Sequence, residues 1–134
     1  MATLDLRAPS ITIKFDKGKD ISPIFYYLSP TSAIIDLTNY HCRMQAKVDY
    51  LSTPTLDLDD QLKGGLSIVT GTAVLDNGTS IPGAYGVKLS LTAAQTALLV
   101  TDLPLLFDIE LVDPVNNTLP FLKGILLPSA EVTT

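Results

Sequence analysis

Residues 41–49, His-Cys-Arg-Met-Gln-Ala-Lys-Val-Asp, alternate strictly between polar and apolar side chains. The apolar positions are the even ones, namely Cys42, Met44, Ala46 and Val48. Because successive side chains of a β-strand point to opposite faces, a period of two predicts a strand with one buried face and one solvated face. This stretch therefore favours a sheet that covers a core on one side and meets water on the other.

The same period recurs along the whole chain. Clear alternation predicts further strands at residues 11–15, 87–91 and 105–111, and weaker patterns predict strands at 24–28, 66–75 and 121–127. Gly71 is expected to mark a bulge or bend. Turn-forming residues lie between these segments, and they predict tight hairpins at 16–18 and 76–78 and a connection between the last two long strands at 113–117.

One segment departs from the strand pattern. Residues 92–99 are rich in helix-forming side chains, and Thr92 and Gln95 have the spacing of a capping box. Many short strands with one helical turn predict an all-β fold, an antiparallel two-sheet β-sandwich of Ig-like or jelly-roll-like type, with about seven or eight strands. The expected core residues are Met44, Val48, Leu89, Leu91, Phe107, Ile109 and Leu111.

The length of 134 residues fits a single domain, which we expect at residues 11–134 behind a possible N-terminal arm at 1–10. Hydrophobic residues make up 46% of this small chain, so some apolar side chains are expected to face a partner. The net charge of −5 and nine scattered basic residues argue against nucleic acid and anionic membranes as partners. The N-terminus does not resemble a signal peptide, and no stretch has the length of a membrane helix.

Candidate catalytic and metal-binding groups are few. His41 and the single cysteine, Cys42, are adjacent on a predicted strand, so their side chains should point to opposite faces rather than form a dyad. A cluster of acidic residues at 57–60 is expected to be a solvated turn, with a calcium loop as the alternative. Asp108 and Glu110 share a polar strand face, where solubility explains them better than acid–base catalysis.

The sequence therefore predicts no enzyme activity, no catalytic residues, no metal and no cofactor. An alternative of another class is a carbohydrate- or receptor-binding module. Its sugar platform would come from the five tyrosines, Tyr26, Tyr27, Tyr40, Tyr50 and Tyr85, although buried or interfacial positions explain these residues equally well.

Several motifs occur together in a characteristic order. They are Asp16-Lys17-Gly18-Lys19-Asp20, then Ile35-Asp36-Leu37-Thr38-Asn39-Tyr40 leading into 41–47, then Leu89-Ser90-Leu91-Thr92-Ala93 through Leu98, then Leu106-Phe107-Asp108-Ile109-Glu110-Leu111, and finally Leu122-Lys123-Gly124-Ile125-Leu126-Leu127. This order resembles a β-sandwich family of bacteriophage virion proteins. Members of that family have a Gly-Asp pair, an Asp-Leu-Thr-Gly-aromatic segment before a strand ending in Arg-x-Gln-x-Arg, a Leu-x-Ala-x-x-Thr-Ala-x-Leu turn, a Tyr-Asp-Leu-Glu-Leu strand and a glycine in the last strand. Here Asn39 replaces the family's glycine, Lys47 the final arginine, and Lys19-Asp20 the Gly-Asp pair.

The resemblance implies a non-enzymatic structural subunit of the tail, baseplate or fibre attachment, or else a capsid decoration protein on the head exterior. Such a protein would be made in the host cytoplasm and located in the virion, with other virion proteins and copies of itself as partners in a homo-oligomer. We expect the arm to contribute Leu4 and Leu6 to the contacts. Because residues 121–127 are apolar on both strand faces, Phe121, Leu122 and Leu126 are expected to contribute as well.

Overall fold

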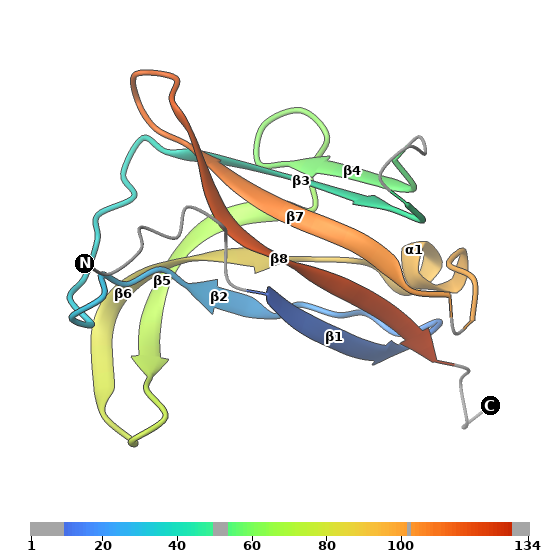
Figure 1. Cartoon of the computed structure of the whole chain (residues 1–134), viewed down its shortest axis with the longest axis horizontal. Helices are drawn as coiled ribbons and strands as arrows, with labels where there is room; N and C mark the ends of the chain where they lie inside the picture. Colours follow the sequence, from blue (N-terminus) through green and yellow to red (C-terminus); the bar gives the residue numbers. More distant parts are fainter. Residues whose placement is uncertain (1–9, 50–53, 102, 130–134) are drawn as a thin grey trace, which may run out of the picture.

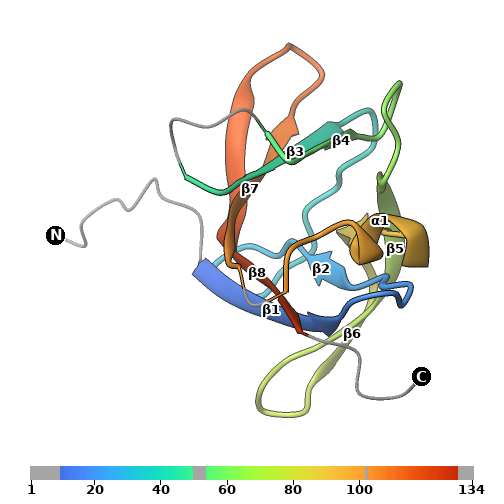
Figure 2. The same ribbon diagram turned by 90° about the vertical axis from the view of Figure 1, so that its right-hand side faces the viewer.

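The structure is a computed structural model that describes residues 10–49, 54–101 and 103–129. Within these residues, eight strands and one short helix form two facing sheets (Figures 1 and 2). The elements are β1 (Ser10–Asp16), β2 (Ile24–Tyr26), β3 (His41–Lys47), β4 (Leu56–Asp59), β5 (Leu66–Val74), β6 (Ser80–Leu89), α1 (Ala93–Ala97), β7 (Leu105–Val112) and β8 (Thr118–Ser129). In the part of the chain that the structure describes, no helix is long and apolar enough to cross a membrane.

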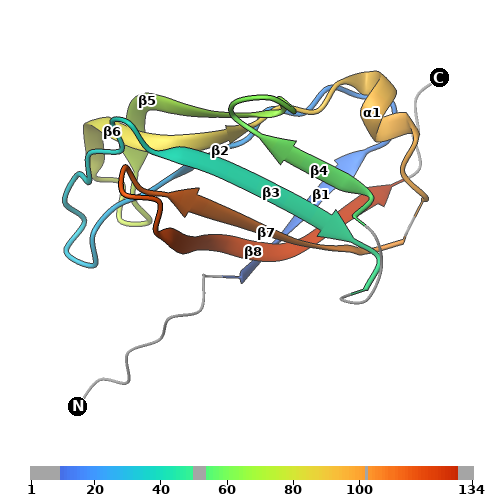
Figure 3. The same cartoon turned by 90° about the horizontal axis from the view of Figure 1, so that it is seen from above.

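The five-stranded sheet has the order β1-β8-β7-β3-β4, and the three-stranded sheet has the order β2-β6-β5. The predicted all-β sandwich is confirmed. Every strand pair is antiparallel except β1 with β8, which is parallel. The edge strand β1 therefore lies beside the last strand of the chain, and Figure 3 shows the other four strands of this sheet side by side.

The predicted hairpin at 16–18 is wrong. This segment is a corner at which the chain leaves the five-stranded sheet and enters the other one, where Ile21 bridges Leu91 and β2 pairs with β6. Gly18 has φ 78°, a left-handed conformation in which glycine meets no steric penalty. The predicted hairpin at 76–78 is confirmed between β5 and β6, and so is the bulge at Gly71, where the register of that pair shifts.

The core lies between the two sheets. Six of the seven predicted core residues are buried there, with exposed fractions between 0% and 4%. Val48 is the exception at 43% exposed, because β3 ends at Lys47 and the alternation no longer applies beyond the strand. The predicted capping box is also confirmed: Thr92 Oγ1 accepts from Gln95 N, and Gln95 Oε1 accepts from Thr92 N.

A bulge explains why β8 is apolar on both faces. Ile109 pairs with Leu122 but Glu110 pairs with Pro120, so Phe121 is an extra residue, and along β8 the inward positions change from odd to even at this point. As a result Phe121 and Leu122 are both buried, at 6% and 7% exposed. Leu126 is 0% exposed.

The three β8 residues predicted as assembly contacts therefore belong to the core of the chain itself and offer little surface to a partner. The other two predicted contacts, Leu4 and Leu6, lie outside the described residues.

Candidate binding site

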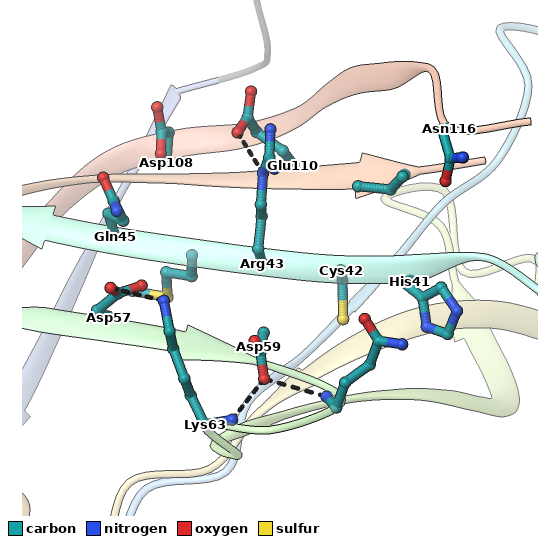
Figure 4. A pocket seen from close by; sticks show the side chains of 13 residues that line it. His41, Cys42, Arg43, Gln45, Asp57, Asp59, Lys63, Asp108, Glu110 and Asn116 are labelled. Carbon is teal, nitrogen blue, oxygen red and sulfur yellow. Dashed lines mark hydrogen bonds and ion pairs between the residues drawn. The ribbon is translucent and has the colours of Figure 1, made fainter.

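The outer face of the five-stranded sheet carries most of the polar side chains that the sequence analysis considered (Figure 4). On β3 the burial pattern alternates, with Arg43 and Gln45 exposed and the residues between them buried. On β7 Asp108 is likewise exposed beside two buried neighbours. The period of two in the sequence thus decides which side chains reach this surface.

Two depressions hollow this face, with volumes of about 710 Å³ and 340 Å³. The larger lies over β3, β4 and β7, and the smaller extends over β8 to Ser10 at the start of β1. Gln45 and Asp108 line both depressions, so the two adjoin on this face of the sheet. We call the two depressions together the polar groove; residues of β1, β3, β4, β7 and β8 and of the loops after β4 and β7 line it.

The strand registers place a row of side chains across the floor of the polar groove. Gln45 is the direct partner of Asp57 on one side and of Asp108 on the other. Asp108 in turn is opposite Lys123, which is opposite Ser10. These five residues come from five strands and form one line perpendicular to the strand direction.

Two ion pairs accompany this row: one lies beside it, and the other includes Asp57 at its end. Arg43 donates from Nε to Oε1 of Glu110 at 3.0 Å, and from Nη2 to the Thr118 hydroxyl at 3.2 Å. Lys63 donates from Nζ to Oδ2 of Asp57 at 2.7 Å. All four charged side chains keep at least a third of their surface exposed, so these pairs organise the groove rather than add much stability.

The acidic cluster at 57–60 is not the solvated turn that the sequence predicts, because it begins within a strand. Asp57 and Asp59 lie on β4, and only Asp60 follows it. Asp59 Oδ1 accepts backbone N–H groups of the following loop, from Gln61, Leu62 and Lys63 at 2.7–3.1 Å. These bonds, the one from Lys63 above all, hold the pKa of the Asp59 carboxyl below its usual range.

The calcium alternative requires carboxylates that converge on one point, and here they diverge. Asp57 pairs with Lys63, Asp59 binds the loop, and Asp60 turns to β3. Among the described residues, no group of three or more histidine, cysteine, aspartate or glutamate side chains is arranged to hold a metal ion. The sequence contains a signal that could have predicted β4, since Leu56 and Leu58 alternate with Asp57 and Asp59.

His41 and Cys42 diverge as predicted. His41 is exposed, and its Nδ1 lies 3.2 Å from Oδ2 of Asp60. Cys42 is buried at 1% exposed, and burial, reinforced by the charges of Asp60 and Asp59, raises the pKa of its thiol to about 12. A thiol in that environment stays protonated and unreactive at neutral pH.

Asp108 and Glu110 share the outer face as predicted, yet they differ in their surroundings. Glu110 is bound to Arg43, whereas Asp108 makes no hydrogen bond or ion pair with any residue the structure describes. Loss of hydration between the strands, and then the charge of Glu110, raise the pKa of the Asp108 carboxyl, while Lys47 and Arg43 act in the opposite direction. Gln45, which the sequence analysis did not single out, is also without such a bond among the described residues.

The four tyrosines that the structure describes do not form the sugar platform that a carbohydrate-binding module would need. Tyr27, Tyr40 and Tyr85 pack against the core, and the ring of Tyr27 meets that of Phe121 edge-on at 5.4 Å. Tyr26 covers Gly71 and Gly86 of the three-stranded sheet. Tyr50 lies outside the described residues.

In comparisons with known proteins, no protein-family model matches the chain, and no curated protein is significantly similar to it.

Proposed function

We propose that the chain is a non-enzymatic structural subunit of a bacteriophage particle, located in the tail, baseplate or fibre attachment, where it assembles with copies of itself and with other virion proteins. The order and spacing of the motifs quoted above support this proposal. Further support comes from the way the motifs work together in the folded chain.

The observation that carries the proposal is a network joining two of these motifs, which lie more than 70 residues apart. Thr96, fully buried in α1, accepts a hydrogen bond from Gly18 N at 3.0 Å and donates one to Lys19 O at 2.8 Å. Asp20 accepts the N–H of Ala93 at 2.6 Å. The corner after β1 is thereby fastened to α1. Lys19-Asp20, which stands where the family has a Gly-Asp pair, is thus bound to the segment that corresponds to the family's Thr-Ala turn.

Two other motifs have roles that suit the same resemblance. Asn39 has φ 67°, so it takes a left-handed conformation where the phage family has glycine, and asparagine tolerates that conformation well. Asp36 accepts the N–H and the hydroxyl of Thr38 just before β3 begins. The glycine of the last strand, Gly124, leaves room for the backbone of Ile11, so β1 can lie directly beside β8.

Exposed apolar side chains offer surface for assembly. Leu98 and Val100 are 84% and 62% exposed in the segment that follows α1, and Val74 is 68% exposed at the end of β5. Burial of such side chains against a neighbouring subunit would remove apolar surface from water, which is the main favourable contribution to association.

Immunogold electron microscopy of phage particles purified from cultures that carry the gene tests the proposal directly. We expect label at a fixed position on the tail or baseplate. Label on the head exterior would assign the chain to capsid decoration instead, and particles that lack the protein altogether would refute a virion role.

A truncation refines the test. Deletion of residues 2–9 should leave the circular dichroism spectrum and the melting temperature unchanged but impair incorporation into particles, because the arm is predicted to bind a neighbour. As the matched control, the Val115→Ser variant changes one exposed apolar residue in a turn and should be incorporated normally. Full incorporation of the truncated chain would exclude the arm as a contact.

A further inference from the structure

The polar groove contains hydrogen-bonding groups that the fold itself does not use. Gln45 and Lys123 make no side-chain hydrogen bond or ion pair with any described residue, and Asp108 between them is equally without one. Together they supply an amide that both donates and accepts, an ammonium donor and a carboxylate acceptor. Such side chains on an exposed sheet are hydrated in the free protein and available to a ligand.

The spacing of these groups is regular. Neighbouring strands lie about 4.8 Å apart, so the row from Asp57 to Ser10 presents five polar side chains over about 19 Å. One strand spacing is close to the length of one sugar ring in an extended oligosaccharide. A ligand lying across the strands would therefore meet a new polar side chain with each ring.

The charges that line the polar groove decide which polymer fits. Apart from His41, four cations and four carboxylates line it: Arg43, Lys47, Lys63 and Lys123, and Asp57, Asp59, Asp108 and Glu110. A polyanion would meet the four carboxylates and a polycation the four cations, so each would pay for unfavourable charge pairs. A neutral ligand with many hydroxyl groups can donate to the carboxylates and accept from the cations and the amide at once.

The groove also contains a small apolar area. Leu106 and Ile125 are direct partners in the register, both are half-buried, and both line the smaller depression next to Lys47. An aliphatic surface of this kind can pack against the apolar face of a sugar ring, in the place that an aromatic ring takes in many ligand sites.

We propose that the polar groove binds a neutral oligosaccharide, which lies across β3, β7 and β8 with Gln45 and Asp108 at the centre of the contact. This inference goes beyond the structural role proposed above and does not depend on it. It assigns ligand binding to the outer face of the five-stranded sheet, whereas the network at α1 and the exposed side chains near it concern folding and assembly.

Affinity gel electrophoresis of the purified full chain is the test. The gels contain dextran, mixed-linkage β-glucan or galactomannan as neutral probes, and hyaluronan or chitosan as charged ones. We expect at least one neutral polymer to retard the protein, and we expect the retardation to be unchanged between about 0.05 and 0.5 M salt because no net charge is neutralised. Stronger retardation by hyaluronan or chitosan, or none by any neutral polymer, would overturn the proposal.

Variants locate the site. Gln45→Ala and Asp108→Ala should each weaken binding at least tenfold, as measured by calorimetry with an oligosaccharide fragment of the polymer that binds. Lys88→Ala, on the three-stranded sheet, is the matched control and should bind normally. Normal binding by both groove variants would refute the site.

Analytical ultracentrifugation tests the remaining alternative, in which a second copy of the chain occupies the groove. If a second copy of the chain fills the groove, wild type will sediment as a dimer that Gln45→Ala disrupts, and the saccharide proposal fails. Immunogold labelling of particles proceeds independently, so a failure here leaves the virion proposal standing, and the reverse also holds.

Discussion

The two edges of the five-stranded sheet are attached by different means. The β1 edge has seven residues, contributes Phe15 to the core, packs Ile11 and Ile13 against it, and lies close to the backbone at Gly124. The β4 edge has four residues and buries only Leu58 fully. Its remaining attachment consists of exposed polar contacts, the Lys63–Asp57 ion pair and the loop bonds of Asp59.

This difference indicates how each edge responds to conditions. Buried apolar contacts and the close approach of two backbones contain no ionisable group, so they depend little on salt and pH. Exposed ion pairs are screened by salt and depend on carboxylate ionisation. We therefore expect β1 to detach from the sheet only when one of its contacts is removed by substitution. We expect β4 to detach both after substitution and at low pH.

Phe107→Ala should lower the stability of the chain more than the other substitutions, because this large residue is buried on β7, between the two edge strands. Phe107 is 4% exposed and stands between two small partners, Ala46 on the β4 side and Gly124 on the β1 side. Loss of its ring should lower the free energy of unfolding by roughly 3–5 kcal/mol in urea denaturation. Val48→Ala is the control, since that residue is exposed, and it should change stability by less than about 0.5 kcal/mol.

Gly124→Ala should affect the β1 edge alone. A Cβ at this position would overlap the backbone carbonyl of Ile11, which cannot rotate away as a side chain could. We expect a loss of about 1–3 kcal/mol and faster hydrogen exchange at the amides of β1, with unchanged exchange in β4. Equal loosening of both strands would show that the two edges are not independent.

Thr96→Val removes the hydroxyl that fastens the corner after β1, with almost no change in shape. The Gly18 N–H and the Lys19 carbonyl lose their partner in a half-buried place, so the cost should be about 1–3 kcal/mol. Thr92→Ala, which removes only the helix cap, should cost about 1 kcal/mol. If the two variants lose the same amount, the hydroxyl matters for the helix and not for the corner.

Asp59→Ala should loosen the β4 edge in a pH-dependent way. Since hydrogen bonds in the folded chain lower the pKa of Asp59, its stabilising effect is complete above its ordinary pKa of about 4 and is lost as the pH falls through the lowered value. The variant should therefore be less stable than wild type at pH 7 and equal to it in strong acid. Melting curves across this range provide the measurement, and parallel curves at every pH would contradict the assignment.

Asp108→Asn should have the smallest effect and the opposite sign. The folded state raises the pKa of Asp108, so its ionised form is slightly disfavoured at neutral pH. The side chain is largely exposed and screened by water, so the amide should stabilise the chain by at most about 0.5 kcal/mol at pH 7. This gain should vanish as the pH falls through the raised pKa, because the wild-type carboxyl then takes up a proton first in the folded state.

Local patterns in the sequence were sufficient for most elements of this fold. The alternation at 41–49 and 105–111 identified β3, which ends at Lys47, and β7 together with their inward faces, and Thr92 with Gln95 identified the only helix among the described residues. Both signals depend on residues a few positions apart, because strand alternation and helix capping are local in the chain. The same alternation correctly separated His41 from Cys42.

Only the tertiary structure decided how distant segments meet. The parallel pairing of β1 with β8 and the corner at Gly18 depend on partners more than 70 residues away in the chain, and the bulge at Phe121 is fixed by the register of β8 against β7. The row from Asp57 to Lys123 is of the same kind: the sequence places Asp57 in an acidic cluster and Asp108 beside Glu110, but only the strand registers bring these two residues into line with Gln45 and Lys123. A sheet joins strands through backbone hydrogen bonds whose register is set by the packing of the whole core, and no segment carries that information alone.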